Sequence, residues 1–255
     1  MPSPPEFDRL TVVLVSTRNP LNIGAAARAM SNMGFLRLRV VNPYEASFRE
    51  ARSAVGAAPL LQCAEEFMSV AEAVADCSLV VGTTAVRHRE IQQPLRLLEP
   101  GAALIGKQLR AGRRIAVLFG SEKRGLSNHD LSHCHWLLHI PTREEHASMN
   151  LGQAVAVCLW ELARAARATD RRARGSASRG SAATVASAGE LERVTATLIE
   201  ALRKSGYLGQ RSVAVKEEKI RRMVRRMALS TGDAEVWLGM LRQMVWKMTP
   251  QGKDQ

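Results

Sequence analysis

Four segments of the sequence combine glycine, small residues and charged side chains in a way that suits ligand binding by the backbone. They are NPLNIGAAAR (19–28), GTTAVRHRE (82–90), GSEKRGLSN (120–128) and PTREEHASMNLGQ (141–153). Gly24, Gly82 and Gly120 stand where a helical pattern begins or an apolar run ends, and glycine lets a backbone approach another group closely. No segment has the GxGxxG or GxxxxGK(S/T) pattern, so dinucleotide-fingerprint and P-loop binding lose their main support.

Arg28 is a lone cation in an alanine-rich helical pattern. A guanidinium is always charged in proteins and presents a planar fork of donors that fits a phosphate or a pair of oxygens. An isolated helix arginine also commonly pairs with a carboxylate inside the fold. The pattern around Arg28 leaves both roles open.

A cluster of histidines raises the question of a metal site. The segment HDLSHCHWLLH supplies four histidines and a cysteine: His129, His133, Cys134, His135 and His139. His129 and His133 are four residues apart on an expected helical turn, but His135 and His139 fall in an alternating, strand-like run. No supporting carboxylates are evident, so these side chains are interpreted as structural and no metal is expected.

Short apolar runs that end in polar or turn residues predict five β-strands, at residues 10–16, 36–42, 77–84, 114–120 and 136–141. Helical patterns lie between them, so the fold class is α/β with a mostly parallel sheet covered by helices on both faces. Ligands of such sheets bind beyond the carboxyl ends of the strands, where the four segments lie. Residues 149–168 predict a long helix that closes this unit.

The chain divides into parts of different composition. We expect a flexible N-terminal tail (1–9), a catalytic domain (10–167), a flexible basic linker (168–189) and a helical basic C-terminal domain (190–255). In the last part, Ile220, Met223, Val224 and Met227 recur at helical spacing, and the arginines between them are expected on the other side. That arginine face is either a phosphate contact or merely solvated.

The overall charge and the cysteines narrow the partners and the compartment. Of the net charge of +12, most lies in residues 164–255, which hold 19 lysines and arginines against 9 acidic residues, whereas residues 1–163 hold 17 against 15. Such a basic segment is typical of nucleic-acid binding, although a solvated face or a membrane surface also fits. The four cysteines form no CxxC pair and no apolar run is long enough to span a bilayer, so a cytoplasmic location without membrane association is expected.

Three of the segments together resemble a known family. NxGxxxR (Asn22, Gly24, Arg28), FGSEKRGLSN (119–128) and IPTxxxxxSMNLxQAV (140–155), in this order, are similar to the motifs of the SPOUT (SpoU-TrmD) RNA 2'-O-ribose methyltransferases. The similarity covers residues 10–165. The segments ALRKSGYL and KIRRMVRRMALSTGDAEVWLGMLRQM also resemble the helical extension of the TrmJ-like subgroup, the tRNA cytidine/uridine-32 2'-O-methyltransferases.

This resemblance implies a C-terminal trefoil knot in the domain, a homodimer, and S-adenosylmethionine as the methyl donor. The residues implied to hold the cofactor are Thr83, Thr84, Ala85, Gly120, Ile140, Ala147, Ser148 and Met149. Those implied at the reacting centre are Asn22, Arg28, Glu122, Ser148 and Asn150. Arg28 would orient the ribose 2'-hydroxyl and the neighbouring phosphate by forked hydrogen bonds, and whether it also accepts the proton is left open.

The predicted activity is therefore methyl transfer to a ribose 2'-hydroxyl of RNA, with position 32 of the tRNA anticodon loop as the target that the subgroup implies. Ribosomal RNA methylation and an RNA-binding module without catalysis remain alternatives, and a nucleotide-dependent oxidoreductase is disfavoured by the missing glycine fingerprint. The expected RNA contacts are Arg28, Arg87, Arg89, Arg221, Arg222, Arg225 and Arg226.

Overall fold

The computed structural model of the chain describes residues 4–44, 58–85, 91–143, 145, 148–173, 184–208 and 213–249. Its centre is a seven-stranded sheet in the order β3-β2-β1-β6-β4-β7-β5, in which every neighbouring pair is parallel. The strands are β1 (Leu10–Val15), β2 (Arg37–Val41), β3 (Glu65–Phe67), β4 (Leu79–Thr83), β5 (Leu95–Leu97), β6 (Ile115–Phe119) and β7 (Trp136–His139).

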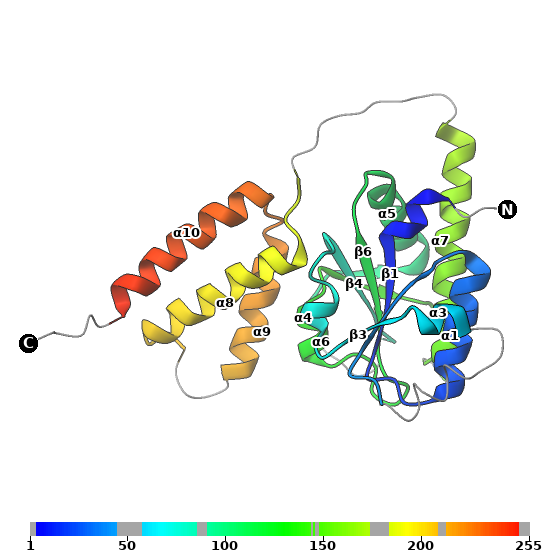
Figure 1. Cartoon of the computed structure of the whole chain (residues 1–255), viewed down its shortest axis with the longest axis horizontal. Helices are drawn as coiled ribbons and strands as arrows, with labels where there is room; N and C mark the ends of the chain where they lie inside the picture. The colour runs from blue at the N-terminus through cyan, green and yellow to red at the C-terminus, as the bar shows by residue number, and fades with distance from the viewer. Residues whose placement is uncertain are drawn as a thin grey trace, which may run out of the picture.

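Helices cover both faces of the sheet, as Figure 1 shows. The helices that follow or separate the strands are η1 (Pro5–Arg9), α1 (Pro20–Met33), α3 (Ala58–Gln62), α4 (Val70–Ala73), α5 (Leu98–Arg110), α6 (Asn128–Ser132) and α7 (Leu151–Ala173). Together with the strands they form what we call the sheet domain. The α/β class, the parallel sheet and the five strands expected from the sequence are confirmed.

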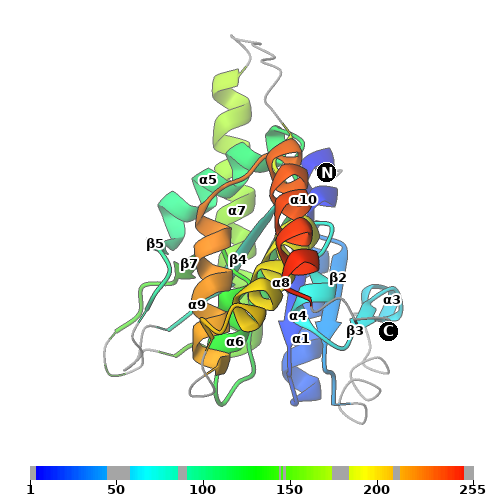
Figure 2. The same ribbon diagram turned by 90° about the vertical axis from the view of Figure 1, so that its left-hand side faces the viewer.

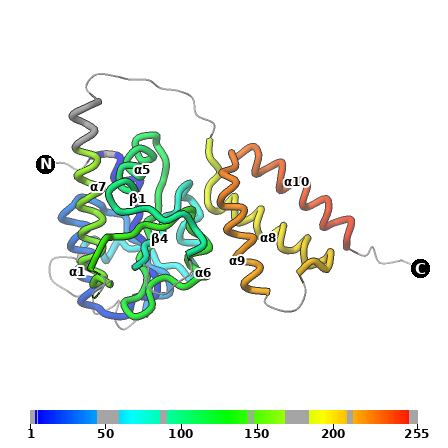
Figure 3. The backbone as a smooth tube through the Cα atoms, turned by 180° about the vertical axis from the view of Figure 1, so that it is seen from behind, coloured from blue at the N-terminus to red at the C-terminus, as the bar shows by residue number. Residues whose placement is uncertain are grey.

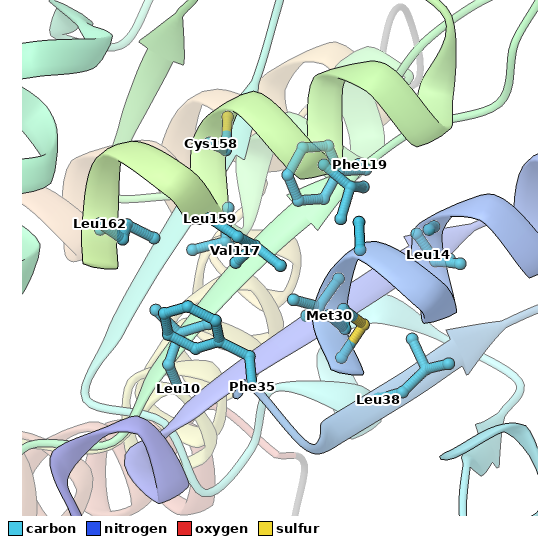
Figure 4. Close-up of a cluster of buried hydrophobic side chains, with 14 of the residues drawn as sticks. Leu10, Leu14, Met30, Phe35, Leu38, Val117, Phe119, Cys158, Leu159 and Leu162 are labelled. Carbon is cyan, nitrogen blue, oxygen red and sulfur yellow. The ribbon is translucent and has the colours of Figure 1, made fainter. Parts of the chain in front are cut away.

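Successive side chains of the central strands point alternately to the two faces of the sheet, and this divides the hydrophobic core into two layers. Val12 and Leu14 of β1 pack in one buried cluster with α1, α5 and α7, whereas Val13 and Val15 pack in the other with α4 and α6. Figure 4 shows the first layer, in which Met30 of α1 and the apolar face of α7 meet the strands. Successive side chains of a strand point to opposite faces, so a sheet with helices on both sides needs the nearly continuous apolar strands found here.

Two three-residue strands were not expected from the sequence. β3 has the sequence EEF, and β5 has LRL with all three residues exposed. Neither run shows the apolar length that identifies a buried strand, and both lie at the edges of the sheet, where pairing on one side is enough.

The N-terminal residues differ from the expected flexible tail. Residues 5–9 form η1, and the Phe7 side chain is buried and stacked on Phe35 with ring centroids 4.1 Å apart. The prediction of a flexible tail is therefore wrong for residues 5–9. Phe7 is a single apolar residue among prolines and charged residues, so the sequence pattern did not indicate its burial.

The C-terminal part is a group of three helices, α8 (Ala188–Lys204), α9 (Val213–Arg226) and α10 (Thr231–Met248), which we call the helical extension. Its own small core joins α8, α9 and α10. Figures 1 and 2 show the extension beside the face of the sheet domain that carries α4 and α6. Among the described helices, none combines the length and the apolar character needed to span a membrane.

The expected linker is shorter than predicted at both ends. α7 continues as a helix to Ala173, and the chain already pairs with the extension at Val185, which bridges Ser230. Figure 3 shows the two parts from behind, with α7 on the side of the sheet domain that lies away from α8. Residues 174–183 lie outside the described residues.

Candidate active site

The loop that follows β6 makes a tight turn that only glycine permits. A Cβ at Gly120 would lie 2.1 Å from both the carbonyl carbon of Gly125 and the amide nitrogen of Leu126. The amide of Gly125 donates to the carbonyl of Ser121 at 2.8 Å, and Gly125 has a φ of +64°, which favours glycine. The loop therefore folds back on its own base and presents the side chains between these glycines outward.

Glu122, in this loop, accepts hydrogen bonds from the start of α1. Its carboxylate oxygens accept from the Asn22 amide at 3.0 Å and from the backbone N–H groups of Asn19 at 3.2 Å and Arg18 at 3.4 Å. Partial burial raises the pKa of Glu122, but these hydrogen bonds outweigh it and hold the pKa below its usual value. Glu122 is therefore a carboxylate at neutral pH.

Asn22 connects Glu122 to the start of α7. The Asn150 amide donates to the Asn22 side-chain oxygen at 2.7 Å, while the Asn150 oxygen accepts from the backbone of Gly152 at 2.9 Å and so caps α7. Asn22 is buried, with an exposed fraction of 9%. Three segments distant in sequence are thus held together by one chain of hydrogen bonds.

The same elements border a cleft of about 290 Å³ at the carboxyl ends of β4, β6 and β7. Its walls come from the strand ends, the loop after β6 and the first turn of α7; they are Thr83, Thr84, Ala85, Phe119, Gly120, Ser121, Glu122, Lys123, Arg124, Gly125, Leu126, Leu138, Ile140, Thr142, Ser148, Met149, Leu151 and Ala154. This is the edge where open parallel sheets bind ligands. The Thr83 hydroxyl donates to the Leu118 carbonyl at 2.8 Å, which ties β4 to β6 at the floor of the cleft.

Comparison with known proteins identifies this arrangement. The profile of the SpoU rRNA methylase family matches residues 9–160, which include every wall of the cleft. The chain belongs to the SpoU rRNA methylase family. Its SpoU domain is therefore the sheet domain described above.

Relatives of this SpoU-family chain resemble it over nearly its whole length. It is 36% identical over 243 residues to the tRNA (cytidine/uridine/adenosine-2'-O-)-methyltransferase TrmJ of Pseudomonas aeruginosa, covering 93% of this chain and 94% of that protein. It is 32% identical to the tRNA (cytidine/uridine-2'-O-)-methyltransferase TrmJ of Sodalis glossinidius, covering 95% and 93%. The crystal structure of TrmJ from Z. mobilis ZM4 superposes with a TM-score of 0.77 at 28% identity, covering 92% of this chain and 98% of that one. The likeness therefore includes the helical extension.

The structure gathers most of the predicted site residues of this SpoU-family chain at the cleft. All the predicted cofactor residues line it except Ala147, which lies outside the described residues; Glu122 and Ser148 line it as well. Asn22 and Asn150 lie directly behind it through their bonds to Glu122 and to each other.

Arg28 is placed differently from the other predicted residues. It is exposed on α1 and does not line the cleft. It lies six positions after Asn22, and at 3.6 residues per turn this places the two side chains about 120° apart around the helix axis. Arg28 and Asn22 therefore point to different sides of α1.

The predicted arginine face of α9 is wrong for three of its four members. Arg222 and Arg225 are buried, with exposed fractions of 6% and 2%, and Arg221 forms an ion pair with Glu192 at 3.0 Å. The helix packs with Ile220 and Val224 inward, but the arginines beside them turn inward too, because carboxylates of α8 and α9 pair with them. Arg226 is exposed and stays a prediction, and Arg87 and Arg89 lie outside the described residues.

Two histidines of the cluster, His133 and His135, are buried or partly buried within the fold. Burial lowers the pKa of His135 to about 3, and burial followed by the charge of Arg221 lowers the pKa of His133 to about 2. Both rings are therefore neutral, and the His135 ring accepts a hydrogen bond from the Val80 amide at 3.1 Å. Within the described part of the chain, no group of three or more histidine, cysteine or acidic side chains is placed to hold a metal ion.

Two groups at the cleft were missed by reasoning from the sequence. The exposed cations Lys123 and Arg124 line the cleft within the loop after β6. The backbone N–H groups of Arg18 and Asn19 fix Glu122, as described above. Lys123 and Arg124 stood inside the quoted motif GSEKRGLSN and could have been noticed there, whereas backbone donors leave no signal in residue type.

Proposed function

We propose that this chain transfers a methyl group from S-adenosylmethionine to a ribose 2'-hydroxyl of tRNA. The observation that carries the proposal is the cleft at the strand ends, whose walls are the motif residues of a SpoU-family domain and whose rim is fixed by the network of Glu122, Asn22 and Asn150. The named tRNA 2'-O-methyltransferases that match both parts of the chain support tRNA as the substrate class.

The cleft fits the proposed cofactor in chemistry and shape. Threonine, glycine and serine at its walls leave the backbone accessible, and the apolar side chains of Leu138, Ile140 and Met149 suit an adenine ring. Thr83, Thr84, Ala85, Gly120, Ile140, Ser148 and Met149 would hold S-adenosylmethionine there. When bound, it supplies a methyl group activated by a positively charged sulfonium.

Glu122 acts by charge and position. Its carboxylate is ionised and lines the cleft, so it favours a cationic ligand there. The hydrogen bonds that it accepts from Arg18, Asn19 and Asn22 come from the start of α1, so the same carboxylate holds that helix against the cleft. We therefore assign Glu122, Asn22 and Asn150 positioning roles, and leave proton transfer to the groups that meet the RNA.

Arg28 is assigned to the RNA. Within the described residues its guanidinium has no ion-pair partner, and its fork of donors is free for a phosphate and a 2'-oxygen. Alignment of the hydroxyl with the methyl group contributes most of what this reaction needs, because an in-line transfer requires orientation and no metal.

A homodimer is part of the proposal. Leu21 of α1 and Trp160 of α7 are 79% and 51% exposed, and α1 and α7 pack closely enough that Gly152 has no room for a side chain beside Ala25. Exposed large apolar side chains on two tightly packed helices favour a partner surface. The trefoil knot implied by the resemblance and position 32 as the target also remain proposals.

The cytoplasm is the proposed compartment. It is supported by the four cysteines, all of which are unpaired and three of which are buried.

The helical extension is proposed to add contacts to the phosphates of the tRNA. Its outward cations include Arg193, Lys219, Arg226 and Arg242, all of them exposed. Phosphate contacts of this kind position a nucleic acid without reading its sequence.

The test is methyl transfer from labelled S-adenosylmethionine to unmodified tRNA and, separately, to ribosomal RNA, followed by mapping of the modified ribose. Label in the anticodon loop of tRNA would support the proposal in full. Label only in ribosomal RNA would keep the reaction and replace the substrate, and absence of label with tight cofactor binding would refute tRNA methylation.

A further inference from the structure

A buried charge cluster lies where the helical extension meets the sheet domain. The Glu192 carboxylate, on α8, accepts hydrogen bonds from the Arg221 Nε at 3.0 and 3.1 Å and from the Arg225 Nη2 at 3.2 Å, both on α9. The Arg225 side chain is 1% exposed. One carboxylate thus binds two cations, and the cluster ties the first helix of the extension to the second.

The same cluster reaches the sheet domain. The Arg221 Nη1 donates to the Ser132 hydroxyl of α6 at 3.3 Å, and the ring of His133 lies 3.6 Å from the Glu192 carboxylate. Burial and the neighbouring cations keep His133 neutral, so it contributes a polar wall and no charge. The charges of the extension are therefore buried against residues of the other domain.

The first turn of α8 forms a second attachment. The Ala188 amide donates to the Cys77 carbonyl at 2.7 Å, and the Gly189 amide donates to the Ala75 carbonyl at 2.9 Å. The first N–H groups of a helix have no partner within it, and here carbonyls of the sheet domain supply that partner. A Cβ at Gly189 would lie 3.0 Å from the Ala75 oxygen, so the two backbones are in close contact.

These contacts oppose free motion of the extension. Separation of the domains would remove Ser132 and His133 from the charge cluster around Glu192. It would also leave the backbone amides of Ala188 and Gly189 without their carbonyl acceptors. Buried charges and buried backbone donors are costly to leave unpaired. Both attachments lie on the α4 and α6 face of the sheet domain (Figure 2). None of the residues that form them lines the cleft.

We propose that the sheet domain and the helical extension act as one rigid body, in which Glu192 positions the outward cations of the extension at a fixed place relative to the cleft. Arg221 and Arg225 are then positioning residues and make no contact with RNA. This inference rests on the proposed function, because it assumes that the cleft and the extension hold the same RNA. The competing arrangement is an extension that must swing on its linker to deliver the RNA.

A reversible crosslink distinguishes the two arrangements. A Cβ at Gly189 would lie 3.3 Å from the Ala75 Cβ, just under the range of about 3.5 to 4.5 Å found in disulfides, so a small backbone shift should let Ala75→Cys and Gly189→Cys lock the domains when oxidised. A rigid body predicts that the oxidised double variant methylates tRNA within about twofold of its reduced form. A loss of tenfold or more on oxidation, restored by reductant, would overturn the proposal, and the two single variants control for the added side chains.

A second variant tests the role of Glu192. Glu192→Gln is expected to raise the KM for tRNA about tenfold while kcat and the affinity for S-adenosylmethionine stay within twofold, because the cleft itself is intact. When Ala75→Cys and Gly189→Cys are added to the same chain, oxidation of the new thiol pair should restore the KM, which a merely local loss of stability would not do. Glu200→Gln, an exposed member of an α8 ion pair with Lys204, is the matched control and should change nothing.

A structural readout separates this inference from the proposed function. Small-angle scattering of the full chain should give the same profile for the wild type and the oxidised double variant. A more extended wild type would overturn the rigid body even if no RNA substrate were found. Failure of the wild type to methylate tRNA would instead refute the proposed function. Scattering would still distinguish the rigid body from the swinging extension in that case, and also if Glu192→Gln fails to fold.

Discussion

Replacement of Glu122 by glutamine tests the network that holds the start of α1 to the cleft. Glutamine can keep one oxygen as the acceptor for Asn22 and Asn19, but its NH2 group would face the Arg18 amide, a donor against a donor. Hydrogen bonds to charged groups contribute about 1.5 to 3 kcal/mol and neutral ones about 1 kcal/mol. Because the carboxylate is partly exposed and the Arg18 bond is long, we expect Glu122→Gln to lower the free energy of unfolding by about 1 to 2 kcal/mol at pH 7.

The effect should depend on pH in one direction. Partial burial opposes ionisation, but the hydrogen bonds from Asn22 and the backbone win, so the folded-state pKa of Glu122 is lower than its unfolded value of about 4.3. A carboxyl group with a depressed pKa contributes stability above the unfolded pKa and loses it as the pH falls through the folded pKa. The difference between wild type and Glu122→Gln should therefore be constant from pH 7 to about 5 and shrink below about pH 4.

Urea unfolding of both proteins at pH 7, 5 and 3.5 measures this difference. Glu99→Gln is the control, because Glu99 is 82% exposed and pairs loosely with Arg164 at 3.6 Å, so it should cost about 0.5 kcal/mol or less. Equal stabilities of wild type and Glu122→Gln at pH 7 would refute the reasoning. So would a deficit that stays the same at pH 3.5, since it would then come from packing and not from charge.

Three further changes probe the cleft and the extension. Arg28→Ala should abolish methyl transfer while leaving S-adenosylmethionine binding within a few-fold, measured by transfer of label and by calorimetry; loss of cofactor binding in a folded protein would contradict the division of roles. Gly120→Ala should remove cofactor binding, because its Cβ would overlap backbone atoms at 2.1 Å, whereas Gly239→Ala, with open space around it, should keep binding and raise stability by up to about 1 kcal/mol. Lys219→Ala with Arg226→Ala should weaken tRNA binding and reduce its salt dependence by about one to two charges; an unchanged slope of log Kd against log salt would remove them from the RNA surface.

The sequence was sufficient where a local pattern has one structural solution. Asn19 caps α1, Pro20 begins it, and Gly34 ends it with a φ of +84°, so both ends of this helix are encoded next to it. The apolar runs that became β1, β2, β4, β6 and β7 likewise fit only a sheet that is covered on both faces. The motif residues of the cleft followed from the resemblance, because they lie on loops that leave those strands.

The sequence was insufficient where a contact joins distant segments. Glu122 and Asn22 are 100 residues apart in the sequence, and the hydrogen bond between them depends on the tight turn that Gly120 allows. Phe7 looked like part of a free tail until Phe35 gave it a stacking partner. In such cases the residue type shows which interactions a side chain can form, and only the tertiary structure shows which partner it contacts.

The amino-acid sequence alone determined the α/β class, the SpoU-family motifs and the amphipathic character of α9. The tertiary structure decided which side of α9 is inside: Met223 and Met227 are exposed, while Arg225 is buried against Glu192. The physical reason is that helical periodicity in the sequence shows only that the helix has an apolar and a polar face. The hydrophobic effect favours burial of the apolar face. A carboxylate on the neighbouring helix reverses that preference for single residues, because a paired and hydrogen-bonded charge can be buried where an unpaired one cannot.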